Sequence, residues 1–328
     1  MLRLPEFRYL APRSLDEAAD LLAEHGSRAM VVAGGTDLFP NMKRRQQEPR
    51  VVIGLRSLAE LRSVSADDGV LRIGATATLH DVATHPLVRD RYPALATAAG
   101  LVSTPHLRRM GTLGGNLCLD TRCTYYDQNY HWRKSIDFCL KKDGAICWVA
   151  PSSPRCWAVS SSDTAPVTVA LRARFRLVSA SGERTVEAGE FFRDDGIQYL
   201  TRRPEEILSS IELADHAGWR MTYEKLRRRG SFDFPILGVA AAVKLSDGVV
   251  EDLRLVLGAV GSSPVDQTDL ARPLVGTRPS REAIQSVAAA AYRGARPLDN
   301  TDLNYAWRKK MTRVYVARAL ARVCNVDD

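Results

Sequence analysis

The stretch Val31-Val32-Ala33-Gly34-Gly35-Thr36-Asp37-Leu38 decides the fold class of this chain. Its apolar start, within the run 29–33, is typical of a short buried strand, and the strand breaks into a glycine turn. Glycine can take positive φ and lets backbone N–H groups approach a phosphate closely. Successive amides in such a turn form an anion-binding nest. We therefore predict that a nucleotide phosphate binds at the end of this strand.

A second glycine loop, Gly111-Thr112-Leu113-Gly114-Gly115-Asn116, has the same character. Neither loop is a Rossmann G-x-G-x-x-G motif, and the chain has no Walker G-x-x-x-x-G-K-[ST] motif. Either loop alone is equally consistent with a tight structural turn. Together they favour one dinucleotide held from two sides, with the Thr36 hydroxyl and the Asn116 amide as further hydrogen-bonding groups.

The 328 residues suggest two or three domains, and we expect boundaries that give units 1–60, 61–215 and 216–328. In the first unit, Ser14 and Glu17 form a capping-box pattern, so a helix is predicted over 14–25. The third unit contains Asp247-Gly248 between two apolar runs, which predicts a β-hairpin. Helices are predicted at 281–293 and 303–323.

The composition is that of a soluble globular protein, with 45% hydrophobic and 26% charged residues. No apolar run approaches the ~20 residues that span a bilayer, and the first residues lack the apolar segment of a secretory signal. We therefore expect a cytoplasmic protein that does not bind membranes. The net charge of +8 has no nucleic-acid module around it, so it favours solvated faces, an acidic partner or an anionic cofactor.

Four of the six cysteines fall in an aperiodic segment at 120–161: Cys123, Cys139, Cys147 and Cys156. A reducing cytoplasm disfavours disulfides, and a loop of this length is rare unless it binds something. Thiolates suit zinc or an iron–sulfur cluster, but no C-x-x-C pair is present to choose between them. Iron–sulfur, zinc and unliganded thiols all remain open from residue types alone.

The other two cysteines, Cys118 and Cys324, are expected to be a buried thiol near the cofactor and a structural residue of the last helix.

Four segments in the same order resemble the FAD-binding (medium) subunits of the xanthine dehydrogenase, or molybdenum hydroxylase, family. They are the two glycine loops, Ser162-Asp163-Thr164-Ala165-Pro166 and Tyr223-Glu224-Lys225-Leu226-Arg227. Their spacing covers nearly the whole chain. The resemblance implies an α+β fold: two α/β FAD-binding subdomains of the PCMH type, then a C-terminal α/β domain of the CO dehydrogenase flavoprotein type.

The resemblance also implies the residues that bind FAD. The amides of 33–37 and 114–116 would hold the pyrophosphate, and Asp163 would accept a hydrogen bond from the ribose or adenine end. Lys225 would approach the isoalloxazine, where a positive charge stabilises the anionic reduced flavin; a surface salt bridge is the alternative. The implied set is Val31, Val32, Ala33, Gly34, Gly35, Thr36, Asp37, Leu38, Val102, Thr112, Gly114, Gly115, Asn116, Asp163 and Lys225.

Within that family, the segment from Gly114 to Tyr126 and the later cysteines resemble the β subunits of 4-hydroxybenzoyl-CoA reductases. This likeness implies a [4Fe-4S] cluster on the four cysteines of the segment 120–161. Basic residues flank them, and these could offset the charge of a cluster, contact an acidic electron donor or simply lie exposed: Lys134, Lys141, Lys142 and Arg155.

The implied function is electron transfer in aromatic degradation. The chain would carry FAD and [4Fe-4S] beside a [2Fe-2S] small subunit and a molybdenum large subunit that holds the substrate, in a dimer of heterotrimers. Ferredoxin would supply electrons that convert 4-hydroxybenzoyl-CoA to benzoyl-CoA. Two alternatives stand: an oxidising aldehyde, xanthine or CO dehydrogenase-type complex, and a zinc-stabilised binding protein without flavin.

Overall fold

The computed structural model describes residues 2–326, and a small parallel sheet opens the chain. Its order is β1-β3-β2, with one long helix and one short helix: β1 (Arg8–Leu10), α1 (Leu15–His25), β2 (Ala29–Val32), α2 (Leu38–Lys43) and β3 (Val51–Gly54). The predicted helix start is confirmed, because Ser14 Oγ accepts the Glu17 N–H at 3.1 Å. Gly26 ends α1 with a φ of 53°, which glycine adopts without strain.

The second sheet has five antiparallel strands in the order β4-β5-β8-β6-β7. Its strands are β4 (Val64–Asp67), β5 (Val70–Gly74), β6 (Arg174–Ser179), β7 (Gly182–Glu187) and β8 (Ile207–Leu213). Between β5 and β6 run short helices: α3 (Leu79–Thr84), α4 (Pro86–Arg91), α5 (Pro93–Leu101), α6 (Pro105–Arg108), α7 (Leu113–Leu117), α8 (Tyr130–Ser135) and α9 (Thr164–Ala170); α10 (Ala188–Phe191) follows β7.

The third sheet is antiparallel, in the order β12-β11-β10-β9, and the predicted hairpin lies at its centre. Asp247 and Gly248 connect β10 to β11 with φ values of 49° and 78°, as a tight two-residue turn requires. The elements are β9 (Trp219–Leu226), β10 (Leu237–Ser246), β11 (Val249–Gly258), β12 (Val265–Asp266), α11 (Thr268–Ala271), α12 (Arg281–Gly294) and α13 (Tyr305–Cys324).

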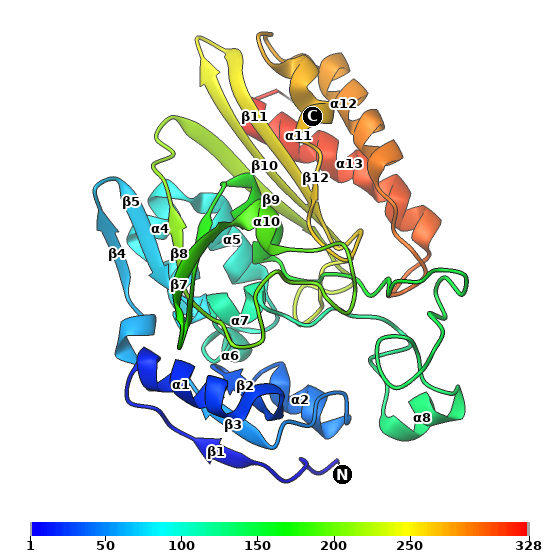
Figure 1. The fold of residues 1–328 in the computed structure, drawn as a ribbon. Helices are drawn as coiled ribbons and strands as arrows, with labels where there is room; N and C mark the ends of the chain where they lie inside the picture. Colours follow the sequence, from blue (N-terminus) through cyan, green and yellow to red (C-terminus); the bar gives the residue numbers. More distant parts are fainter. Residues whose placement is uncertain (1, 327–328) are drawn as a thin grey trace.

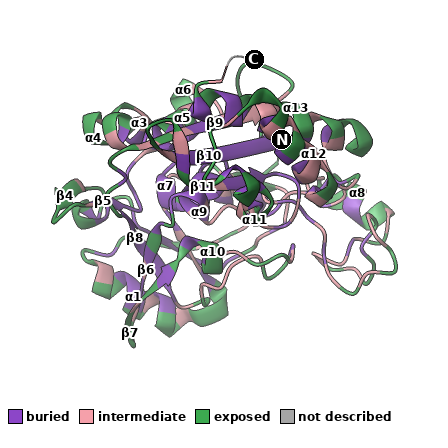
Figure 2. Cartoon of the chain, turned by 90° about the horizontal axis from the view of Figure 1, so that it is seen from above, coloured by how far each residue is buried: buried purple, intermediate pink, exposed green. Residues whose placement is uncertain are grey.

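Helices cover both faces of the third sheet (Figure 1). The long helices α12 and α13 pack on one face, while α5 and α9 pack on the other and join it to the second sheet. The central strand β10 is therefore buried along most of its length (Figure 2). The strands of each sheet come from one of the three expected units, whose boundaries stay a prediction.

The cysteine-rich segment projects from the edge of this body, with α8 at its outer end (Figure 1). Its two ends meet at a neck, where Arg122 and Val159 exchange backbone hydrogen bonds of 2.8 and 2.7 Å. We call residues 123–158 the insert. No helix within residues 2–326 is long and apolar enough to cross a membrane.

A core prediction follows from the second sheet. Phe175 is fully buried, with its ring perpendicular to that of Phe191 at a centroid distance of 4.9 Å. Phe175→Ala should lower the free energy of unfolding by about 3–5 kcal/mol, since it leaves a cavity. Val314→Ala, at an exposed position of α13, should change it by less than about 0.5 kcal/mol. Chemical denaturation measures both, and equal losses would contradict the assigned core.

Candidate functional site

The two glycine loops meet in space. A Cβ atom on Gly34 would lie 1.9 Å from the carbonyl oxygen of Met110, directly before the second loop. A Cβ atom on Gly114 would lie 2.7 Å from the Cβ atom of Ala75. Gly35 has a φ of 70°, which disfavours any side chain. Glycine is therefore required at these positions by the backbone itself.

Both loops line one cavity of about 1370 Å³. This volume exceeds the roughly 300–1,000 Å³ of ordinary small-molecule pockets and suits an extended dinucleotide. Thirteen of the fifteen implied FAD residues line it: Val31, Val32, Ala33, Gly34, Gly35, Thr36, Asp37, Leu38, Val102, Thr112, Gly114, Gly115 and Asn116.

The amides of the two loops are not equivalent. In the second loop, Gly114 donates to the Ala75 carbonyl at 2.8 Å, and Gly115 donates to Thr112 Oγ1 at 3.1 Å. Among the hydrogen bonds within residues 2–326, none is donated by the backbone N–H groups of Gly34 or of its two successors. Unpaired backbone donors beside a cavity need a partner. The first loop therefore offers the free phosphate donors, while the second shapes the wall.

Asn116, expected to hydrogen-bond the cofactor, uses its carbonyl oxygen within the protein. Its Oδ1 accepts from Ser162 Oγ at 2.9 Å and from Thr164 Oγ1 at 2.7 Å. The segment 162–166, which is part of the family resemblance, thus holds the second glycine loop in place through Asn116.

Asp163 and Lys225, the other two implied residues, lie behind the cavity wall and pair with each other at 2.8 Å. Tyr223 donates its hydroxyl proton to the same carboxylate at 2.9 Å. Burial raises the pKa of Asp163 and lowers that of Lys225, and their mutual attraction opposes both shifts. Lys225 Nζ also donates to the Leu101 carbonyl at 3.0 Å, next to the cavity residue Val102. The pair is thus placed to position the segment that faces the cavity.

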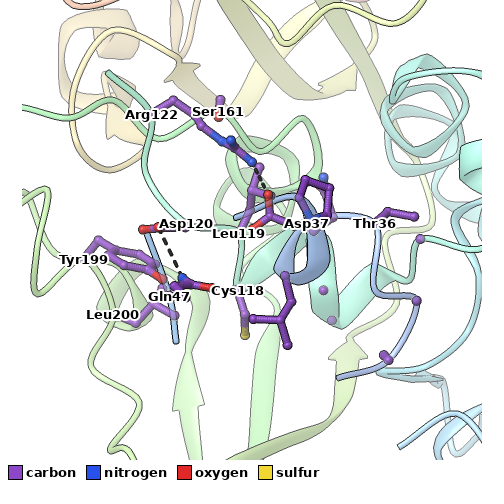
Figure 3. Close-up of a pocket in the computed structure, with 18 of the residues that line it drawn as sticks. Thr36, Asp37, Gln47, Cys118, Leu119, Asp120, Arg122, Ser161, Tyr199 and Leu200 are labelled. Carbon is purple, nitrogen blue, oxygen red and sulfur yellow. Dashed lines mark hydrogen bonds and ion pairs between the residues drawn. The ribbon is translucent and has the colours of Figure 1, made fainter. Parts of the chain in front are cut away.

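Part of the cavity wall comes from residues that no motif indicated. Tyr199 and Arg202 lie in an irregular stretch after β7, and Phe232 and Phe234 lie in the turn after β9. Single aromatic or basic residues in loops form no periodic sequence pattern, so only the fold shows that they reach the cavity. Cys118, predicted to be a buried thiol near the cofactor, lines the cavity and is half-buried (Figure 3).

The four cysteines of the insert are each buried. Cys123, Cys139 and Cys156 share a small apolar cluster with Tyr126 and Ala158. Burial raises the pKa of Cys123 to about 12, and the charges of the other three thiols add to that rise. Three of the four thiols thus share one apolar cluster, and Cys147 is not among its members. Among residues 2–326, however, no three His, Cys, Asp or Glu side chains gather as ligands of one metal ion.

The charged residues beside the cysteines are mostly engaged. Lys141 Nζ donates to Asp120 Oδ1 at 2.8 Å, and Arg155 pairs with Asp194 at 2.8 Å. Two of the insert's tryptophans, Trp132 and Trp148, each have more than one-third of their surface exposed.

Comparisons with known proteins agree with this geometry. A family model described as the FAD binding domain in molybdopterin dehydrogenase matches residues 5–214, and one described as the CO dehydrogenase flavoprotein C-terminal domain matches residues 221–323. The chain is 29% identical over 320 residues to the carbon monoxide dehydrogenase medium chain of Hydrogenophaga pseudoflava, covering 96% of each. It is 31% identical over 270 residues to an aldehyde oxidoreductase FAD-binding subunit of Escherichia coli, covering 79% of this chain and 82% of that one.

A solved structure of the Hydrogenophaga pseudoflava carbon monoxide dehydrogenase, in a form that lacks the Mo-pyranopterin moiety of the molybdenum cofactor, has the same fold. The TM-score is 0.82 at 28% identity, with 99% of this chain and 100% of that chain covered. The predicted fold class is thereby confirmed.

The contact between the loops generates a prediction about cofactor content. Gly34→Ala forces its methyl group into the Met110 carbonyl, so the loops must separate. We expect the purified protein to lose most of its bound flavin, measured by visible absorption per mole of protein. Gly189→Ala is the matched control, because a Cβ there meets no atom within 4 Å. Full flavin content in Gly34→Ala would contradict the site.

Proposed function

Since this chain belongs to the family of FAD-binding subunits of molybdenum hydroxylase-type enzymes, we propose that it passes electrons between one FAD and a [4Fe-4S] cluster in its insert. The proposal that FAD binds here rests on the free backbone amides of the first glycine loop, which lie beside a cavity of dinucleotide size. The family and the cavity together make this chain an oxidoreductase subunit.

Bound FAD supplies a centre that exchanges electrons singly or in pairs. The chain's own residues bind and orient it. The amides of Gly34, Gly35 and Thr36 would donate to its diphosphate, as the amides of an anion nest do. Lys225 and Arg108 hold the carbonyls of Leu101 and Val102 at 3.0 and 2.9 Å, which fixes the Val102 side chain against the cavity.

The proposal of an iron–sulfur cluster rests on the cysteine ligands that the insert offers. The insert has four buried thiols, three of them in one small apolar cluster, and cysteine thiolates are the usual ligands of an iron–sulfur cluster. A cubane places irons and sulfides between its ligands, so its thiolates stand farther apart than those of a single ion. The Ala158 N–H donates to Cys156 Sγ at 3.4 Å, and such a hydrogen bond would help to set the potential of a bound cluster.

Iron content tests the cluster. Cys139→Ser should remove most of the bound iron and its broad visible absorption, because one of four ligands is lost. Cys324→Ser, a buried cysteine in the C-terminal core, should keep both. Metal analysis under anaerobic conditions measures the difference. Zinc in place of iron would instead favour the zinc-stabilised binding protein, and equal iron in both variants would reject the proposed ligands.

The proposed partners are a molybdenum-cofactor large subunit and a [2Fe-2S] small subunit, in a dimer of heterotrimers. The relatives are named as medium chains and FAD subunits, which supports assembly with other chains. A ferredoxin-like donor would dock on the insert. Tyr130, Trp132 and Trp148 are exposed on the insert, which also carries half-buried Lys142, and a surface with aromatic and basic residues favours a small acidic protein.

For the complex, we propose reduction of 4-hydroxybenzoyl-CoA. Two electrons and two protons convert it to benzoyl-CoA and water at the molybdenum subunit. This assignment rests on the position of the four cysteines. The alternative is oxidation of a substrate such as an aldehyde, xanthine or CO, and it is favoured by the names of the relatives, which include carbon monoxide, glyceraldehyde and nicotinate dehydrogenases.

Turnover by the purified complex separates the two directions. With a reduced low-potential donor and 4-hydroxybenzoyl-CoA, we expect benzoyl-CoA to form at one equivalent per two electrons consumed. A second assay, with aldehydes, xanthine or CO and an artificial electron acceptor, tests the alternative of an oxidising complex. Activity only in the second assay would reject the reductase, and the complex carrying Gly34→Ala should be slow in whichever assay is positive.

A further inference from the structure

The cysteine-rich region docks on the chain that directly follows the first glycine loop. Gln46 Nε2 donates to the Tyr126 carbonyl at 2.6 Å. Arg133, fully buried, donates to the Arg44 and Arg45 carbonyls at 3.1 and 3.0 Å. These are contacts between residues about 80 to 90 positions apart in sequence. The insert is thus fastened to the end of α2, although it projects from the body (Figure 1).

One side chain completes this attachment at the glycine loop itself. Arg122 extends from the neck of the insert and pairs with Asp37, the residue after Thr36 (Figure 3). Its other terminal nitrogen pairs with Asp127 at 3.1 Å. The second oxygen of Asp127 accepts the Cys123 N–H at 3.2 Å. A continuous chain of charge-assisted hydrogen bonds therefore runs from the glycine loop to the first cysteine.

The surroundings make this chain of contacts rigid. The Arg122 side chain is 11% exposed, and its guanidinium lies 4.8 Å from the centre of the Phe234 ring. Asp37 also accepts from Asn41 at 3.1 Å, at the start of α2. The Asp37 and Asp127 side chains are 27% and 24% exposed, so both ion pairs are partly shielded from water. Charge-assisted arginine–carboxylate hydrogen bonds are short and directional. Arg122, Asp37 and Asp127 all line the cavity, so the neck of the insert is part of the cofactor wall.

We propose that Arg122 is a positioning residue that couples FAD binding to the order of the insert. FAD fixes the first glycine loop, the loop fixes Asp37, and Arg122 passes that constraint to Asp127 and the Cys123 backbone. By reciprocity, an ordered insert strengthens FAD binding by the same factor. The inference rests on the proposed flavin site, and it does not depend on which metal the insert holds.

The test uses the purified complex depleted of FAD, with FAD added back as the probe. In the wild-type complex, FAD should slow backbone hydrogen exchange both at 34–37 and at 118–128. In Arg122→Gln, the slowing at 34–37 should remain and that at 118–128 should be lost. The FAD dissociation constant should rise about tenfold, within the usual range of couplings between sites. Arg122→Lys keeps the charge without the two-pronged geometry and should restore only part of the effect.

Arg155→Gln is the matched control. It removes an arginine–aspartate pair of the same insert whose partner, Asp194, lies outside the glycine loop, so FAD should still protect 118–128. If Arg122→Gln fails to fold, Asp127→Asn interrupts the same chain of contacts and should give the same loss. Undiminished protection of 118–128 in either variant overturns the coupling and leaves the flavin site standing. Absence of FAD binding to the wild-type complex overturns both.

Discussion

The approach of Gly34 to the Met110 carbonyl is the contact on which the rest of this structure depends. It brings the backbone of a parallel strand–turn–helix unit against the backbone between α6 and α7, with no room for a methyl group. Because the loops touch, one cavity has a wall from each subdomain. A displacement of either loop would open the cavity and separate the donors from the surface that faces them.

The two glycine loops differ in whether their backbone amides are already hydrogen-bonded. The second loop satisfies its own amides through Ala75 and Thr112, so it is rigid before any ligand arrives. The first loop leaves its amides open and so retains the capacity to bind an anion. Behind them, the Lys225–Asp163 pair is buried at a cost in solvation that its hydrogen bonds to Tyr223 and Leu101 offset. A charged pair of this kind holds one backbone segment in one place.

Local sequence patterns predict the features that depend on a few neighbouring residues. The capped helix α1, the Asp247–Gly248 hairpin and both glycine loops follow from rules that act over a few residues. Sequence reasoning did not foresee that Asp163 and Lys225 would pair behind the wall, because 62 residues separate them and either could equally face a ligand. Nor did it predict Arg122, since an arginine among cysteines has the same local pattern whether it meets Asp37 or water. Pairings across the fold depend on tertiary geometry, which single-sequence patterns do not contain.

The neck formed by Arg122 and Val159 has a consequence for how such a chain can change over generations. Because the chain leaves and re-enters the body at adjacent residues, the segment between them can lengthen or shorten without moving the sheets. Most of the insert could therefore be acquired or discarded in one genetic event while the three sheets keep their arrangement. Its side-chain anchors would have to be established afterwards, one substitution at a time.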